Sequence, residues 1–425
     1  MKVYLDTIGC RLNQSEIETM ARQFRAAGHE IVASAADANL AVVNTCAVTA
    51  GAASDSRGRI RQIARAGVDE IVATGCWATL QPDRANALPN VSRVVANDRK
   101  DHLVADVLHF PQQTFDMEPI VREPLPGLHH RTRAFIKVQD GCDNHCTFCI
   151  TTIARGAGHS RPVSDVISDV QFALDGGAKE IVLTGVHLGS WGQDFRMRLY
   201  DLIKALLHET NMPRLRLSSL EPWDLDKEFF SLWEDPRLCP HLHLPLQSGC
   251  AATLKRMVRK TSPDSFRELI TAARQIMPEV AITTDIIAGF PGETEEEFAE
   301  SLAFIREMNF AGGHAFTYSP RPGTGAARMR AQVHPEVRKE RNAIYRAVFD
   351  ESAKAYRQKF IGRTLPVLWE STTQLDDQGW QMEGLTGNYM RVSAISGAPR
   401  WNEMDDVELI ENSTGMVQGV IRRTG

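Results

Sequence analysis

The sequence lacks any long apolar run and any excess of basic residues. No apolar stretch reaches the roughly 18 residues of a membrane-spanning helix, and no basic–apolar–small-residue leader follows Met1. We therefore expect a cytoplasmic protein with no membrane partner. The formal net charge of −5 does not suggest a nucleic-acid-binding protein, so a basic patch must be local. At about 150 residues per domain, 425 residues predict about three domains.

Cysteine is scarce as well, with eight in the whole chain. Such sparse cysteines argue against a disulfide framework and favour metal or redox use. Three are clustered as Cys142-Asp-Asn-His-Cys146-Thr-Phe-Cys149, after a strand-like run at 134–140. Thiolates hold iron–sulfur clusters, and three ligands on a four-iron cubane leave one iron free for chemistry. A zinc site and chance clustering are the alternatives.

The C-x3-C-x2-C spacing resembles that of the radical S-adenosylmethionine (SAM) superfamily. The resemblance implies a [4Fe-4S] cluster on Cys142, Cys146 and Cys149. In that superfamily the free iron binds the amino and carboxylate groups of SAM. An electron from the cluster then cleaves SAM to a 5′-deoxyadenosyl radical.

The first 97 residues alternate short apolar runs with helix-like segments, which predicts a parallel α/β sheet. Cys10, Cys46 and Cys76 each follow one of the first three runs. The carboxyl ends of parallel strands share one edge of the sheet, where such folds bind ligands. We therefore expect these cysteines to converge on a second cluster. Three unrelated buried thiols are the alternative.

Three amino-terminal motifs sharpen the resemblance. They are Gly9-Cys-Arg-Leu-Asn-Gln-Ser-Glu16, Asn44-Thr-Cys-Ala-Val-Thr49 and Thr74-Gly-Cys-Trp-Ala78. With the later cysteines they resemble the methylthiotransferase family, which replaces a C–H bond by C–S–CH3. The resemblance implies two [4Fe-4S] clusters, the auxiliary one on Cys10, Cys46 and Cys76. It further implies that the auxiliary cluster delivers sulfur and that a second SAM supplies the methyl group.

The predicted organisation has three domains. The fold class is α/β, with an open parallel sheet, a partial (βα)6 barrel and a small carboxyl-terminal β-barrel. The barrel follows from six strand–helix repeats, short of a full eight, and 384–392 resembles the TRAM signature. The last domain has five arginines and no lysine against nine acidic residues, which disagrees with an RNA-binding surface. The predicted ranges are 1–110, a proline-rich linker 111–131, 132–334, a connecting helix 335–360 and 361–425.

Polar and glycine residues recur at the expected carboxyl ends of the barrel strands, where barrel enzymes place their chemistry. They predict a SAM pocket, although each alone fits a turn or a helix cap. His187 and His243 are pocket candidates that a structural role explains equally well, and Cys239 and Cys250 are interpreted as structural. The predicted SAM contacts are Gly185, Ser219, Glu221, Gln247 and Asp285.

Arginines give the local basic signal. Arg57, Arg61 and Arg65 recur every four residues and would form one stripe on a helix. This stripe has two alternative interpretations: contact with phosphate groups, or a solvated helix face. Arg391 in the last domain is a further RNA-binding candidate.

The motifs look most like the branch that acts on threonylcarbamoyladenosine beside the tRNA anticodon. Isopentenyladenosine in tRNA and an aspartate of a small-subunit ribosomal protein are alternative substrates. Other classes are a radical SAM enzyme that donates no sulfur and a non-catalytic iron–sulfur RNA-binding module. Expected partners are tRNA, an electron donor and a sulfur source, with a monomeric chain.

One departure from the family is Thr152, where a proline is usual.

Overall fold

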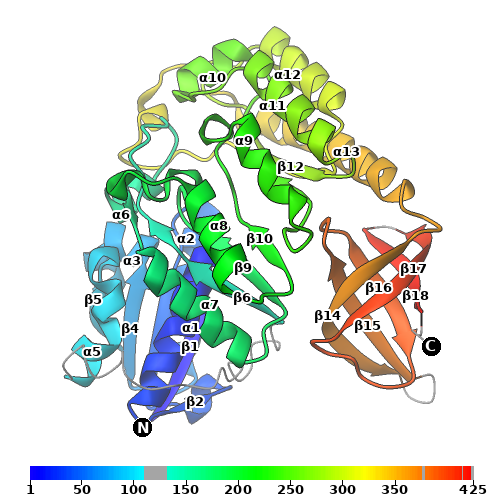
Figure 1. Cartoon of the computed structure of the whole chain (residues 1–425). Helices are drawn as coiled ribbons and strands as arrows, with labels where there is room; N and C mark the ends of the chain where they lie inside the picture. Colours follow the sequence, from blue (N-terminus) through cyan, green and yellow to red (C-terminus); the bar gives the residue numbers. More distant parts are fainter. Residues whose placement is uncertain (110–131, 376–378, 414, 423–425) are drawn as a thin grey trace.

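The computed structural model describes residues 1–109, 132–375, 379–413 and 415–422. The predicted linker at 111–131 lies outside these residues. Three structural units follow one another along the chain, and Figure 1 shows the last one as a separate small barrel beside the other two. Among the described residues no helix combines the length and apolar character needed to cross a membrane.

The first unit is a five-stranded parallel sheet of order β2-β1-β3-β4-β5. Its strands are β1 (Lys2–Thr7), β2 (Glu30–Val32), β3 (Leu40–Thr45), β4 (Glu70–Gly75) and β5 (Val91–Val95), and its helices α1 (Arg11–Ala26), α2 (Ala50–Arg65), α3 (Cys76–Leu80), α4 (Pro82–Asn86) and α5 (Leu103–Leu108). Alternate residues of β3 face opposite sides: Val42 packs with Phe24 of α1, whereas Val43 packs with Ile60 of α2. Helices therefore cover both faces of the sheet, as the alternation of runs predicts.

The second unit has six parallel strands in two three-stranded sheets, β10-β9-β6 and β11-β12-β13, bridged by Ser219 and His243. The strands are β6 (Arg133–Lys137), β9 (Glu180–Thr184), β10 (Leu215–Leu217), β11 (His241–His243), β12 (Ala281–Ala288) and β13 (Gly312–Thr317), with a small antiparallel pair, β7 (Gln139–Asp140) and β8 (His159–Ser160). The helices are α6 (Thr151–Arg155), α7 (Val163–Asp175), α8 (Leu199–Glu209), α9 (Lys227–Phe230), α10 (Ala251–Met257), α11 (Pro263–Ile276) and α12 (Glu295–Met308).

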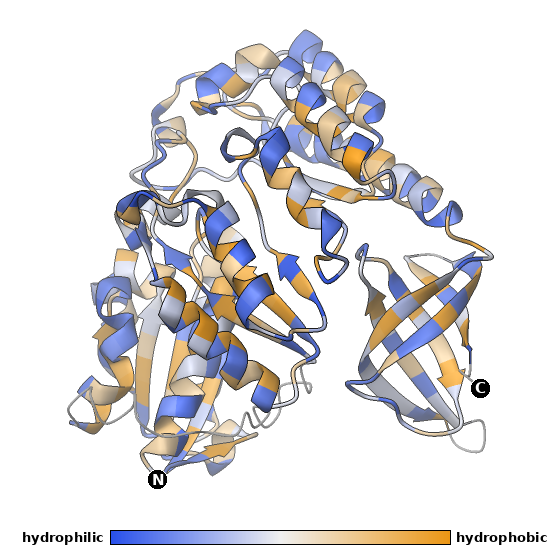
Figure 2. Cartoon of the chain, in the orientation of Figure 1, coloured by the Kyte–Doolittle hydropathy of each residue, from blue (hydrophilic) through white to orange (hydrophobic). Residues whose placement is uncertain are grey.

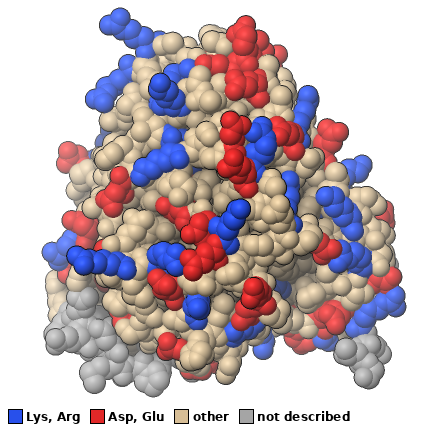
Figure 3. Space-filling view, turned by 45° about the horizontal axis from the view of Figure 1, so that its top comes forward, with Lys and Arg blue, Asp and Glu red and all other residues tan. Residues whose placement is uncertain are grey.

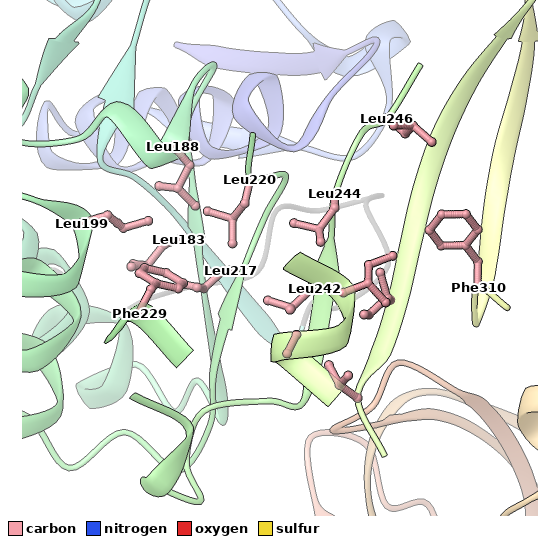
Figure 4. Close-up of a cluster of buried hydrophobic side chains, with 14 of the residues drawn as sticks. Leu183, Leu188, Leu199, Leu217, Leu220, Phe229, Leu242, Leu244, Leu246 and Phe310 are labelled. Carbon is pink, nitrogen blue, oxygen red and sulfur yellow. The ribbon is translucent and has the colours of Figure 1, made fainter. Parts of the chain in front are cut away.

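The core of the second unit lies between its strands and the helices outside them. Leu183, Leu217 and Leu242 come from three successive strands and are almost fully buried. Figure 4 shows them with other apolar side chains, including Phe229 and Phe310, in one cluster. Six parallel strands with helices on their outer side confirm the predicted partial barrel.

The third unit is a closed antiparallel-rich barrel of order β14-β15-β16-β18-β17. It follows the long helix α13 (Pro335–Gln358), and its strands are β14 (Thr364–Leu375), β15 (Gly379–Thr386), β16 (Arg391–Ser396), β17 (Met404–Ser413) and β18 (Met416–Ile421). Figure 2 shows apolar and polar residues alternating along these strands, as expected when one face of each strand lines a core. Within the stretch 384–392, Tyr389 precedes β16 and has a positive φ of 66°.

The third unit is fixed to the amino-terminal ends of the barrel strands of the second. Arg216 on β10 donates from Nη1 to the carbonyl of Gly387 at 2.9 Å, and the ring of His241 stacks on Tyr389 with centroids 4.2 Å apart. Tyr389 also accepts a hydrogen bond from Arg11 of the first unit. All three units thus meet at Tyr389.

We propose domain limits of 1–110, 132–334 and 361–425, with 335–360 as the connection.

Glu180 anchors this junction. It is fully buried and pairs with Arg216 at 2.7 Å and Arg214 at 3.0 Å. Burial opposes ionisation, but the two guanidinium groups outweigh it and lower the pKa of Glu180 to about 2, from an ordinary value of 4.5. The stabilisation is therefore present above pH 4.5 and is lost as the pH falls towards 2.

We predict that Glu180→Gln lowers the free energy of unfolding by about 3–5 kcal/mol near neutral pH, because it leaves buried arginines uncompensated. Thermal unfolding measured from pH 7 down to pH 3 checks this. The difference in melting temperature between wild type and variant should become smaller at the acid end of this range. Glu234→Gln, at an exposed position, is the control and should change little. Equal melting temperatures of the two variants at pH 7 would contradict the stabilising role of Glu180.

Candidate functional site

A cavity of about 820 Å³ lies between the three units. Six of the eight cysteines line it, three from the first unit and three from the second: Cys10, Cys46, Cys76, Cys142, Cys146 and Cys149. Cys239 and Cys250 are buried and do not line it. The structure thus brings together the two sets of cysteines that the sequence places far apart.

The three amino-terminal cysteines sit at consecutive strand ends of the sheet. Cys10 precedes α1, Cys46 follows β3, and Cys76 begins α3 directly after β4. Close packing of these loops requires glycine: a Cβ on Gly9 would lie 2.8 Å from Cys46 Sγ, and one on Gly75 would lie 2.3 Å from a backbone oxygen. Both glycines have positive φ, 114° and 91°.

The chemistry of these thiols fits a metal cluster. Burial raises the pKa of Cys46 to about 11, and the neighbouring thiols of Cys10 and Cys76 add to the rise. Burial likewise raises the pKa of Cys10. Three adjacent thiolates repel one another unless a cation holds them, and metal coordination deprotonates thiols outright. Cys10, Cys46 and Cys76 therefore suit an iron–sulfur cluster better than they suit free thiolates.

The second set of cysteines lies in the loop between β7 and α6. Gly141 starts the loop with φ 68°, where a Cβ would lie 1.9 Å from the carbonyl oxygen of Ala157. Each sulfur has a nearby donor. The backbone N–H of Asn144 lies 3.5 Å from Cys142 Sγ, Arg259 Nη1 3.9 Å from Cys146 Sγ, and Thr152 Oγ1 3.9 Å from Cys149 Sγ.

Hydrogen bonds to cluster sulfurs help to set a cluster's reduction potential, so this donor set fits cluster ligands. Thr152, which replaces the usual proline, supplies one of these donors. Among the described residues no three or more His, Cys, Asp or Glu side chains are placed to hold one metal ion. This result excludes a site for a single metal ion among those residues. It does not exclude a cubane, because the ligands of a cubane bind different irons and need not converge on one point.

A buried ionic network joins the two cysteine sets. Arg155 on α6, just after the cysteine loop, donates from Nη1 to Glu16 Oε1 at 2.9 Å and to Asp140 Oδ1 at 2.8 Å. Its Nη2 donates to Asn13 Oδ1 at 2.9 Å, and Lys100 Nζ donates to Glu16 Oε2 at 2.8 Å. Asn13 and Glu16 belong to the helix that follows Cys10. The network therefore fixes one set of cysteines relative to the other.

Glu16 stays ionised in this network. Burial alone would raise its pKa, but Lys100, Arg155 and Lys137 outweigh burial and lower the pKa of Glu16 far below its usual range. Its side chain is 2% exposed, as is that of Arg155. A buried charge costs several kcal/mol unless it is paired, so every member of the network depends on the others.

The five predicted SAM contacts all line the same cavity: Gly185, Ser219, Glu221, Gln247 and Asp285. Glu221 binds Arg259 at 2.6 Å, and Asp285 accepts from His243 at 3.2 Å. One carboxylate oxygen of Asp285 is buried without a hydrogen-bond partner in the described residues. Gln247 has a positive φ of 76° and lies beside Asp285 in the chain fold, with its N–H donating to the carbonyl of Asp285. Their role as SAM contacts stays a prediction.

His187 lies outside the cavity wall. Its Nε2 contacts Asp224 Oδ2 at 2.6 Å and its Nδ1 contacts Asn144 Nδ2 at 3.2 Å. Burial lowers its pKa, but hydrogen bonds to Asp224 and Cys142 outweigh this and raise the pKa of His187 to about 10. His187 therefore links the cysteine loop to Asp224, whereas His243 lines the cavity itself.

The four arginines predicted for RNA differ in exposure and come from two units. Arg61 and Arg65 are exposed on α2, whereas Arg57 is half-buried with its guanidinium 5.9 Å from the centroid of the Trp77 ring. Arg391 is exposed and lines the cavity from the third unit. Figure 3 shows basic and acidic residues interspersed over the face in view. RNA contact by these residues stays a prediction.

Sequence reasoning missed the polar contacts around the cysteines. Asn13 and Glu16 stand in a motif quoted above and Arg155 follows the second set of cysteines, yet nothing in their spacing shows that they bond one another. Asn144 stands between two cysteines, and Arg259 follows α10 with no motif around it. Their common signal is polar or charged residues within a few positions of a cluster ligand, which applies to all but Arg259.

Comparisons with known proteins agree with this geometry. The family described as Uncharacterized protein family UPF0004 matches residues 2–96, and the Radical SAM superfamily matches residues 136–305. The threonylcarbamoyladenosine tRNA methylthiotransferase MtaB of Bacillus subtilis is 36% identical, with 92% of this chain and 89% of that protein covered. The protein of the same name from Thermotoga maritima is 39% identical, covering 87% and 86%.

A second group of relatives is slightly more distant. The tRNA-2-methylthio-N(6)-dimethylallyladenosine synthase of B. subtilis is 32% identical, covering 88% of this chain and 77% of that protein. Among solved structures, the radical S-adenosylmethionine methyltransferase TsrM of Kitasatospora setae matches with a TM-score of 0.59 at 14% identity, covering 77% of each chain. That similarity concerns the fold alone.

We predict that Arg155→Gln loosens the contact between the first two units, because it leaves Glu16 and Asp140 without their shared cation. Removing one partner of a buried pair costs about 3–5 kcal/mol. Hydrogen exchange should therefore rise in 11–16 and 141–156 and stay unchanged in the third unit. Arg267→Gln removes an exposed ion pair and is the control, with little effect expected. Unchanged exchange at 11–16 would count against the network.

Proposed function

Because the chain belongs to the radical SAM methylthiotransferase family, we propose that it converts threonylcarbamoyladenosine beside the tRNA anticodon to its 2-methylthio derivative. The observation that carries this proposal is the meeting of six cysteines from two units on one cavity. A radical SAM site alone would need only Cys142, Cys146 and Cys149. The second set facing the same cavity supports sulfur insertion.

Two [4Fe-4S] clusters and SAM, when bound, would supply the one-electron chemistry, the sulfur and the methyl group that no side chain offers. Carbon 2 of an adenine carries no acidic proton, so acid–base residues alone cannot activate it. This chain's residues hold and enclose the reactants. The two cysteine sets bind the clusters, and Arg155 fixes their relative position. Leu385 and Tyr389 of the third unit close part of the cavity wall.

The threonylcarbamoyl branch is favoured over its alternatives by the relatives. The proteins named for that branch are 33–39% identical, against 31–32% for the relatives named for the dimethylallyl branch. Methylthiolation of dimethylallyl (isopentenyl) adenosine remains the second candidate function. A tRNA substrate supports our proposal that the protein acts in the cytoplasm. An electron donor and a sulfur source complete the proposed partners, and we propose that the chain acts as a monomer.

We predict that tRNA from a deletion strain lacks the methylthio derivative of threonylcarbamoyladenosine and accumulates its precursor. Mass spectrometry of nucleosides from digested tRNA checks this. Restoring the wild-type gene should restore the product, whereas a Cys146→Ala gene should not. Retention of the methylthio product in the deletion strain would refute the proposed substrate. Loss of the methylthio dimethylallyl derivative instead would establish the second candidate.

We also predict that the reconstituted protein binds about eight irons per chain, as two cubanes require, and that Cys46→Ala binds about four. Cys250→Ala is the matched control, since Cys250 is buried away from the cavity, and it should keep about eight. Iron analysis after anaerobic reconstitution makes the comparison. A wild-type value of about four would favour a radical SAM enzyme that donates no sulfur. Failure of the intact protein to form 5′-deoxyadenosine would favour a non-catalytic module.

A further inference from the structure

Two half-buried arginines near the amino-terminal cysteines have no acidic partner among the residues that the structure describes. The fully buried arginines of the described chain are all ion-paired with carboxylates: Arg155, Arg214, Arg216, Arg259 and Arg341. By contrast, Arg57 and Arg321 make no ion pair with any acidic side chain that the structure describes. Such cations, partly removed from water, are suited to an anionic ligand.

Different units bring these two arginines together. Arg57 lies on α2, with its guanidinium over the ring of Trp77, the residue after Cys76. Arg321 lies in the loop that follows β13. This loop is attached to the start of α2, where the N–H of Ala50 donates to Ser319 Oγ at 3.4 Å. The contact brings the loop that carries Arg321 to the domain that carries the auxiliary cysteines.

Arg321 interacts electrostatically with both Arg57 and Cys46. Burial lowers the pKa of Arg321, the neighbouring Arg57 lowers it further, and Cys46 acts in the opposite direction. The Nε of Arg321 is buried and has no hydrogen-bond partner among the described residues. An unpaired buried donor costs about 1–3 kcal/mol, which an accepting anion would recover.

The surroundings of the pair are apolar and open. Val48, which lines the cavity beside Cys46, is 52% exposed, and Ile153 on α6 is 53% exposed. Gly323, in the loop of Arg321, packs so near Ile153 that an added Cβ would lie 3.4 Å from its Cδ1. The rim thus offers apolar surface for a flat base next to two cations.

We propose that Arg57 and Arg321 form the subsite that binds the carboxylate of the threonylcarbamoyl group on the substrate adenosine. The proposal rests on the function proposed above and names the residues that select between its two candidate substrates. Guanidinium groups bind carboxylates through paired, charge-assisted hydrogen bonds. A dimethylallyl group carries no charge, so the two arginines gain no electrostatic attraction from it. Arg57 is predicted from the sequence as a phosphate contact, whereas this proposal gives it a carboxylate as its anion.

The test uses the reconstituted holoenzyme and three fluorescent anticodon stem-loop RNAs of one sequence. The adenosine next to the anticodon carries threonylcarbamoyl, its uncharged carboxamide, or no modification. Fluorescence anisotropy gives each dissociation constant. Wild type should bind the charged RNA at least about tenfold more tightly than the carboxamide, as expected for hydrogen bonds to a charged group.

Arg321→Gln and Arg57→Gln should each lose most of this preference while binding the carboxamide RNA as wild type does. Arg328→Gln, an exposed arginine near the same loop, is the matched control and should keep the full preference. Iron content and the visible absorption spectrum of each variant should match wild type. Retention of both clusters would show that the arginines serve the ligand and not the cluster.

Other outcomes overturn the assignment. Equal weakening for all three RNAs would make the arginines phosphate contacts, and lost iron would make them supports of the auxiliary cluster. Preference retained by both variants, or absent in wild type, would also overturn it. The proposed function fails separately: it is refuted if wild type forms no methylthio product from threonylcarbamoyl RNA under reducing conditions, whatever the binding data show.

Discussion

The buried pairing of Arg155 with Glu16 and Asp140 is the interaction on which the rest of the site depends. It joins the helix after Cys10 to the segment after Cys149, with both partners almost fully removed from water. Replacing such a network by apolar packing would often cost no stability. Its value is geometric, because charged hydrogen bonds are satisfied in only one arrangement of the two units. Lys100 and Asn13 complete that arrangement and leave no freedom for one cysteine set to slide past the other.

Much of this architecture follows from local patterns in the chain. The alternation of apolar runs predicts the parallel sheet and the six barrel strands, and the position of Cys10, Cys46 and Cys76 just past three strands predicts their convergence. The family resemblance and the fold class are confirmed by relatives and structure. What patterns did not predict are the short edge strand β2 and the barrel strands β15 and β18, whose apolar signal is interrupted by polar residues or glycines such as Gly384 and Gly419.

Contacts between distant residues explain the rest of what was missed. The acidic composition of the third unit disagreed with an RNA surface, but part of that charge serves pairing: Glu370 binds Arg133 of the second unit, and Asp405 binds Arg400. The conserved-looking run 384–392 carries the residues that dock this barrel, Tyr389 above all, beside the exposed Arg391. No periodicity can show which partner a lone tyrosine or arginine finds several hundred residues away. Only the fold supplies that information.

The contact between Arg11 and Tyr389 has a consequence for how the protein is made. Arg11 follows Cys10 directly, and Tyr389 lies 378 positions further along the chain. Domains fold in order during synthesis. The contact beside Cys10 therefore forms only after the segment up to Tyr389 has been synthesised, so the amino-terminal sheet can fold before the carboxyl-terminal barrel docks against it.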